Sequence, residues 1–250
     1  MNARTFLAVV VAASLLGCEP QVKTPDKEKV APPPVAKTPP PAETEKPVEV
    51  KRVPMGKNVE FENRSDKSRR VRIDAEVCFR EGPLELLLCR KRSKEHEAVV
   101  AADIDARDVH KALLAAGAKA GSPVKYVPKF VPPTGSPIKI TIEYAIDGKT
   151  VTVPAREWVR NAKTKKTLDS DWVFAGSLFY PNPEGQDKPP LYAANGGDII
   201  CVSNFDGAML DLPIDSSKDN DDLQFEANTD RIPPLGTKVV VILEVVPEKK

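Results

Sequence analysis

The chain has 250 residues, and its 37 Lys and Arg side chains are balanced by 36 Asp and Glu side chains. This balance argues against nucleic acid as a partner, because no net positive charge attracts the phosphate backbone. Of the four cysteines, those after Cys18 are Cys78, Cys89 and Cys201, and these three thiols allow one disulfide and leave one cysteine over.

The N-terminus has the pattern of an export signal. Arg4 precedes an apolar run from Phe6 to Leu16, which is shorter than the roughly 20 residues needed to cross a bilayer. The run ends in Leu15-Leu16-Gly17-Cys18, which resembles the lipobox of bacterial lipoproteins. The resemblance implies that residues 1–17 are a signal peptide and that the Cys18 thiol carries a diacylglycerol. The alternative is an ordinary signal peptide with a chance cysteine.

Residues 18–54 are rich in proline, with runs at Pro32–Pro34 and Pro39–Pro41. Prolines remove backbone donors, and apolar side chains are too sparse here to offset the entropy cost of ordering. We therefore expect a disordered linker that extends up to about 100 Å as polyproline II and holds a single domain, residues 58–247, away from a membrane. A proline-rich docking ligand is the alternative to a simple spacer.

The domain opens with apolar residues that alternate with charged ones from Val71 to Phe79, followed by a return strand from Leu84 to Leu88. A four-residue loop from Arg80 to Pro83 would pair Val77 with Leu86.

This pairing decides between the disulfide candidates Cys78, Cys89 and Cys201. It would place Cys78 and Cys89 on one face but roughly 13 Å apart, which is too far for a bridge. The sequence therefore argues against a Cys78–Cys89 disulfide and leaves Cys201 as a partner for either.

One helix is expected at about residues 105–117, capped by Asp105 or Asp103 and ended by Gly117. Strict alternation from Ile138 to Ile146, followed by Asp147-Gly148, predicts a hairpin that pairs Ile142 with Val153. Further along, we expect a helical turn at 156–160, a buried strand at 172–180, a hairpin joining 191–194 to 199–202, and a last strand at 238–246. One helix among many strands predicts an α+β fold with a mostly antiparallel sheet.

Several short segments, in this order, resemble the YdjY-type domain family of exported bacterial proteins. The resemblance covers roughly residues 70–247 and implies one extracytoplasmic domain, but it supplies no catalytic residue. Its segments are Val77–Glu85, Lys94–Glu97, His110–Gly117, Trp172–Ser177 and Asn195–Ile200.

Two groups of residues are candidate metal ligands. His96, His110 and Glu97, with Glu95 and Asp103 nearby, could hold zinc if the helix folds back on the preceding strand. Their spacing is not a tight ligand motif, and His110 on a helix is equally a partly buried histidine satisfied by a carboxylate.

The second group could hold calcium in a loop, because oxygen ligands recur at places one, three, five and twelve. The alternative is a solvated acidic loop, since Asp222 stands where an apolar anchor is expected. The calcium candidates are Asp215, Ser217, Asp219, Asp221 and Glu226.

A group of basic residues is expected near one edge of the first hairpin, where it could contact anionic lipid or polysaccharide. Alternatively, interleaved carboxylates neutralise it. Its members are Arg69, Arg70, Arg72, Arg90, Lys91, Arg92 and Lys94.

No nucleophile motif supports catalysis, because Ser177 lacks the Gly-x-Ser-x-Gly elbow. We therefore expect a lipid-anchored envelope protein that acts as a binding or structural module, without a cofactor. Its partners would be the membrane, through the lipid, and a protein or polysaccharide of the envelope. The alternatives are a metal-dependent enzyme that uses His96 and His110, and calcium-dependent recognition through residues 215–226.

Overall fold

The computed structural model describes residues 48–216 and 223–246, which belong to one compact unit. Strands account for 42% of the structure and helix for 9%, and the strands close into an eight-stranded barrel. The predicted α+β class is therefore wrong, since the fold is mostly β. The strands before the helix are β1 (Val50–Gly56), β2 (Val59–Arg64), β3 (Arg69–Val77), β4 (Leu86–Arg90) and β5 (Ala98–Ala102).

The remaining elements follow the helix α1 (Ala106–Ala115). They are β6 (Ala120–Ser122), β7 (Thr134–Gly135), β8 (Pro137–Ile146), β9 (Lys149–Pro154), the 3-10 helix η1 (Ala155–Trp158), β10 (Val159–Asn161), β11 (Trp172–Phe174), β12 (Phe179–Tyr180), β13 (Leu191–Tyr192), the 3-10 helix η2 (Ala193–Gly196), β14 (Ile200–Cys201), β15 (Leu210–Asp211), β16 (Phe225–Ala227) and β17 (Lys238–Val245).

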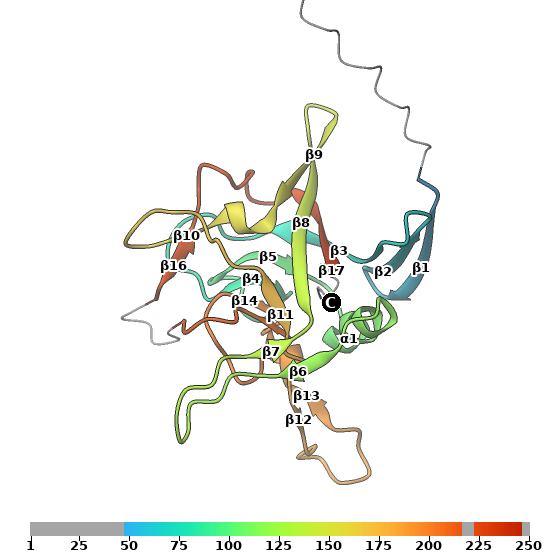
Figure 1. Cartoon of the computed structure of the whole chain (residues 1–250), viewed down its shortest axis with the longest axis vertical. Helices are drawn as coiled ribbons and strands as arrows, with labels where there is room; N and C mark the ends of the chain where they lie inside the picture. The colour runs from blue at the N-terminus through green and yellow to red at the C-terminus, as the bar shows by residue number, and fades with distance from the viewer. Residues whose placement is uncertain (1–47, 217–222, 247–250) are drawn as a thin grey trace, which may run out of the picture. The chain divides into compact units, whose positions relative to one another are not determined.

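The barrel is a ring in the order β3-β17-β8-β11-β15-β14-β4-β5, and β5 pairs back with β3 (Figure 1). Val77 lies opposite Val100 at this closure. Two neighbouring pairs, β4–β5 and β14–β15, are parallel. Side chains alternate between the inside and the outside in a barrel strand just as they do in an open sheet. The alternation in the sequence therefore could not show that the sheet closes.

The expected hairpin between residues 71–79 and 84–88 is also wrong, because β5 lies between β3 and β4. After β3 the chain leaves the sheet: Leu84 donates its N–H to the carbonyl of Phe225, and Pro83 bridges to Glu226. Every side chain from Leu86 to Cys89 is buried, as in a strand covered on both faces. A continuous apolar strand carries no alternation that would fix its neighbour.

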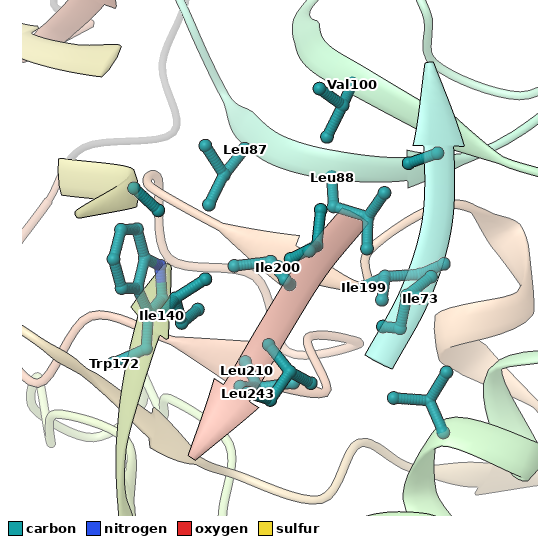
Figure 2. Packing of buried hydrophobic residues seen from close by; sticks show 14 of the residues in the cluster. Ile73, Leu87, Leu88, Val100, Ile140, Trp172, Ile199, Ile200, Leu210 and Leu243 are labelled. Atoms are coloured by element: carbon teal, nitrogen blue, oxygen red, sulfur yellow. The ribbon is translucent and has the colours of Figure 1, made fainter. Parts of the chain in front are cut away.

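The barrel interior is filled by apolar side chains from all eight strands. Figure 2 labels at least one such residue from each of them, and all of these are almost fully buried. Branched and aromatic side chains suit this closed space because they fill it without leaving polar atoms unpaired. The labelled residues are Ile73, Leu87, Leu88, Val100, Ile140, Trp172, Ile199, Ile200, Leu210 and Leu243.

The β8–β9 hairpin is confirmed, with Ile142 opposite Val153. Its turn places Asp147 at φ 51° and Gly148 at φ 74°, the left-handed geometry that an Asp-Gly turn favours. The turn at η1 and the last strand, β17, are confirmed as well.

The predicted helix is confirmed as α1. The Asp105 side chain accepts the N–H of Arg107 at its start, and Gly117 follows its end at φ 96°. The helix buries Val109 and Leu113 against the core. Among the described residues, no helix has both the length and the apolar character needed to cross a bilayer.

Three other expectations differ from the structure. The strand expected at 172–180 is broken between β11 and β12, and residues 191–202 form no hairpin, because β13 pairs with β12 while β14 pairs with β4 and β15. Strand β1 begins at Val50, inside the segment assigned to the linker, and pairs with β2. The signal peptide, Cys18 and the linker up to residue 47 lie outside the described residues.

Candidate functional site

A cleft of about 650 Å³ lies beside the β12–β13 ribbon and η2. Tyr180 on its wall is 45% exposed, whereas Tyr192 is buried. Most ligand pockets combine apolar walls with a few placed polar groups, and this cleft has both. Its polar lining side chains are Arg107, Asn182, Asn195, Asp198 and Asp206.

Tyr192 is fixed at the cleft by two hydrogen bonds. Its hydroxyl lies 2.8 Å from His110 Nδ1 and donates to the carbonyl of Gly176 at 3.0 Å. Because the hydroxyl has a single hydrogen, His110 Nδ1 must be the donor in the first bond. Burial lowers the pKa of His110, which favours its neutral form. The histidine therefore positions Tyr192 and is not free to bind a metal through Nδ1.

Ser177 joins three segments of the cleft wall. Its hydroxyl donates to the carbonyl of Gly207 at 2.6 Å and accepts the N–H of Ala194 at 3.0 Å. Its φ of 61° is rare for a side chain other than glycine, and Gly176 before it has φ 92°. These two residues follow strand β11 and redirect the chain before β12. Because the Ser177 hydrogen is held by a carbonyl, the serine is a structural residue here.

Asn195 ties the start of α1 to the cleft. Its Oδ1 accepts the N–H of Ala106 at 2.8 Å, and its Nδ2 donates to Asp105 Oδ1 at 3.0 Å. The Arg107 guanidinium pairs with Asp105 at 2.6 Å, and this bond holds the pKa of Asp105 well below its usual range. The lining side chains Arg107 and Asn195 are thereby held in place before any ligand arrives.

A cluster of charged groups adjoins the cleft around Lys94. The Lys94 ammonium lies 3.0 Å from Asp198 Oδ1, 3.4 Å from Glu97 Oε1 and 4.4 Å from the centre of the Phe205 ring. Burial opposes its charge, but Asp198 and Glu97 outweigh burial and raise the pKa of Lys94.

Glu85 in the same cluster is buried, and its backbone N–H donates to the carbonyl of Glu97. Burial, followed by repulsion from Glu97, raises the pKa of Glu85 to about 7. Glu85 is therefore partly protonated at neutral pH.

The zinc candidates His96 and His110 have different partners. The His96 side chain is 76% exposed and lies 3.7 Å from Glu97, whereas His110 is bound to Tyr192. Across residues 48–216 and 223–246, no three His, Cys, Asp or Glu side chains are grouped so that they could hold a metal ion. The geometry gives the zinc hypothesis no support.

The calcium candidates lie partly outside the described residues, which end at 216 and resume at 223. Asp215 is exposed. Glu226 lies on β16 and pairs with Arg160 at 2.6 Å and with Lys165 at 2.8 Å. These two cations lower the pKa of Glu226 and already neutralise its carboxylate, so Glu226 is not prepared for calcium.

Four of the seven basic residues, Arg70, Arg72, Lys91 and Lys94, form ion pairs with carboxylates. Arg70 lies 2.6 Å from Glu244, and Lys91 lies 3.0 Å from Glu76. Glu76 and Lys91 line a second hollow of about 540 Å³, which also contains Lys238. Exposed ion pairs of this kind leave little net charge for an anionic surface.

The three cysteines belong to one part of the buried core. Cys89 and Cys201 belong to a small buried cluster with Leu86 and three alanines, and Cys78 packs against it. All three are free thiols. The distance of roughly 13 Å was estimated from strand spacing in a pairing that the barrel does not contain.

The sequence did not identify Tyr192 or Asn195 as residues of the site. Ser177 was considered as a catalytic nucleophile and in no other role. The segment Asn195-Gly196-Gly197 indicated a turn, but nothing in it showed that the Asn195 side chain reaches a helix 90 residues earlier in the chain. The clearest available signal was that the short segments resembling one family include all of these residues except Tyr192.

Comparison with known proteins gives one match. A family model described as the YdjY domain matches residues 65–244. No curated protein and no solved structure matches the chain.

Proposed function

Because the chain belongs to the YdjY domain family, we propose that it is an envelope binding module, held to a membrane by lipid on Cys18. The N-terminal sequence supports the location: Arg4, the apolar run and Leu15-Leu16-Gly17-Cys18 occur in the order that lipidation requires. More than one acyl chain gives stable attachment, whereas a single chain binds only reversibly.

The location is tested by mass spectrometry and fractionation of the full chain. We expect the mature protein to begin at an acylated Cys18 and to sediment with membranes, and Cys18→Ala to abolish both. A mature chain that still begins with Met1 in the cytosolic fraction would contradict the proposal.

The ligand that the cleft fits best is a polysaccharide. The ring of a sugar is apolar on its C–H face and is bordered by hydroxyl groups that both donate and accept hydrogen bonds. Tyr180 supplies an exposed aromatic face for such a ring. Asn182, Asp198 and Asp206 supply amide and carboxylate groups around it. This combination in one cleft is the observation that carries the proposal.

The cleft is also largely prepared in advance. The Tyr192 and Ser177 hydroxyls form hydrogen bonds with backbone groups of the cleft wall, and the Asn195 side chain is fixed by two hydrogen bonds. A prepared site loses little conformational entropy on binding. We therefore expect affinity to depend on two exposed side chains of the cleft, Tyr180 and Asp206.

Calorimetric titration of the full chain in detergent with a tetrasaccharide of N-acetylglucosamine tests this. We expect binding that weakens at least tenfold in Tyr180→Ala and about fivefold in Asp206→Ala. Thr150→Ala, in the second hollow, is the matched control and should bind like the wild type. The absence of binding, or binding lost only in Thr150→Ala, would overturn the assignment of the ligand and the cleft.

A further inference from the structure

The loop between β6 and β7, residues 123–133, carries exposed apolar side chains. In Figure 1 it extends away from the barrel, at the end opposite to the β8–β9 turn. Val127 in this loop is 86% exposed, and Tyr126 and Val131 are exposed as well. Three such side chains on one short loop form a group, and exposed apolar groups on a protein surface mark interaction sites.

The loop is held in shape by its own backbone and by the barrel. Lys125 and Val131 exchange two backbone hydrogen bonds, at 3.0 and 2.8 Å, which close the tip of the loop. The Tyr126 hydroxyl donates to the carbonyl of Asn204 at 2.8 Å, and its ring centre lies 6.0 Å from that of Phe130. Asn204 is fully buried, so this bond ties the tip to the core. A loop fixed in this way loses little conformational entropy when it binds a partner.

The loop is also basic. Residues 109–142 contain five lysines and no Asp or Glu. Two of these lysines, Lys125 and Lys129, lie in the loop and are exposed. Neither side chain forms an ion pair with a carboxylate in the part of the chain that the structure describes. They differ in this from Arg70 and Lys91 on the sheet, whose charges are paired.

Exposed apolar side chains beside unpaired lysines suit the surface of an anionic bilayer. Apolar and aromatic side chains enter the region just below the headgroups, and lysines on their flexible stems reach the lipid phosphates. We propose that loop 123–133 contacts an anionic bilayer, with Val127 among the upper acyl chains and with Lys125 and Lys129 at the lipid phosphates.

The contact is weak alone and becomes useful in a chain that is already at the membrane. Each lysine near an anionic surface raises the affinity about fivefold. Lipid on Cys18 would keep the loop close to the bilayer, so this use of the contact rests on the proposed function. The chain before β1 reaches up to about 100 Å, whereas a domain of this size is about 45 Å across. The loop can therefore turn to the membrane although the chain enters the domain at β1.

The loop adjoins the cleft as well. Asn204, which holds Tyr126, stands two residues before Asp206, and Asp206 lines the cleft. A bilayer at the loop would therefore hold the cleft close to the lipid headgroups.

Lysine labelling of the full wild-type chain tests the contact. The chain is mixed with an excess of vesicles, either of phosphatidylcholine alone or of phosphatidylcholine with phosphatidylglycerol, and is acetylated briefly before peptide mapping. On the anionic vesicles we expect Lys125 and Lys129 to react at least about threefold more slowly than on the neutral ones. Lys149, exposed at the β8–β9 turn, is the control and should react equally on both. Equal labelling of the loop lysines on the two kinds of vesicle would overturn the proposal.

Tryptophan reporters test whether the loop enters the bilayer. Val127→Trp places an indole on the loop, and Ile146→Trp places one on the exposed β8–β9 turn, while the two native tryptophans are buried in both variants. With brominated lipid in the anionic vesicles, we expect quenching to be at least about threefold stronger in Val127→Trp. High salt, or Lys125→Ala combined with Lys129→Ala, should reduce it toward the control. Equal quenching of the two reporters would overturn the placement of Val127.

These results can be separated from those for the proposed function. Mass spectrometry of the N-terminal peptide in the same sample reports whether Cys18 is acylated. Protected loop lysines on a chain without acylated Cys18 would support the loop and contradict the anchor, whereas unprotected lysines on an acylated chain would do the reverse. The sugar titration uses detergent without vesicles, so it is independent of both.

Discussion

Glu62 and Asp211 are equally buried carboxyl groups with opposite charge preferences. Glu62 on β2 is 1% exposed, and Asp211 on β15 is 0% exposed. Glu62 lies 3.0 Å from Arg52, 3.2 Å from Arg64 and 3.8 Å from Arg72. Burial alone would raise the pKa of Glu62, but the hydrogen bonds from Arg52 and Arg64 outweigh it and lower the pKa.

No Lys or Arg within residues 48–216 and 223–246 forms an ion pair with Asp211. Its Oδ1 accepts hydrogen bonds from Asn204 Nδ2 and from the N–H of Leu212, and its buried Oδ2 has no hydrogen-bond partner in the described part of the chain. Burial therefore dominates and raises the pKa of Asp211 to about 7. The comparison teaches that burial alone does not set the charge state of a carboxyl group; the nature of its partners decides it.

The largest effect expected from this comparison is that of Glu62→Gln. Removing the charge leaves three arginines facing one another around a buried amide, and we expect a loss of about 4 kcal/mol in the free energy of unfolding. Urea denaturation at pH 7 measures it. Glu60→Gln, on the same strand and only partly buried, is the control and should cost less than about 1 kcal/mol. Equal losses in the two variants would mean that the arginine pairs contribute little.

Asp211→Asn should instead raise the free energy of unfolding. The folded state favours the protonated acid, so the wild type loses stability as the pH rises from about 4, the unfolded pKa, to about 7. A neutral amide keeps the Oδ1 acceptor and removes this loss. We expect the variant to be more stable than the wild type by about 3 kcal/mol at pH 8 and equal to it near pH 4. Denaturation midpoints across this range measure the difference, and parallel profiles would contradict the assignment.

Glu85→Gln tests a carboxyl group that lies between these two extremes, because its partner Glu97 is another acid. Its raised pKa means that wild-type stability falls between pH 4.5 and about 7. We expect the variant to gain about 1 kcal/mol at pH 8 and to equal the wild type near pH 4. Denaturation midpoints between pH 4 and pH 8 measure the gain, and a gain that does not change with pH would contradict the raised pKa of Glu85.

Asp105→Asn should have the smallest effect. Asparagine also caps helices well, so only the ion pair with Arg107 is lost, and we expect less than about 1 kcal/mol at pH 7. Because the Arg107 bond depresses the pKa of Asp105, the wild-type advantage should be full above about pH 4, the unfolded pKa, and shrink progressively as the pH falls below it. A difference that stays constant from pH 4 to pH 2, measured by thermal unfolding, would point to the cap instead of the charge.

The sequence predicted features that depend on neighbouring residues. Asp147-Gly148 predicted the β8–β9 hairpin, and Asp105 with Gly117 predicted the ends of α1. It did not predict the closed barrel, because closure requires β5 to pair with β3 as well as with β4. The site was harder still to predict, since Tyr192 and His110 lie 82 residues apart along the chain and meet only through the completed fold.

If lipid on Cys18 holds the chain to a membrane, as we propose, strand β1 has a mechanical consequence. It lies at the end of the strand order, its one strand neighbour among the described residues is β2, and most of its side chains are exposed. Each strand of the closed ring instead has a bonded neighbour on both sides. Tension that arrives along the preceding chain would therefore strip β1 from β2 first, while the ring and its cleft keep their shape. Detachment of β1 would therefore take up an applied force before the barrel begins to unfold.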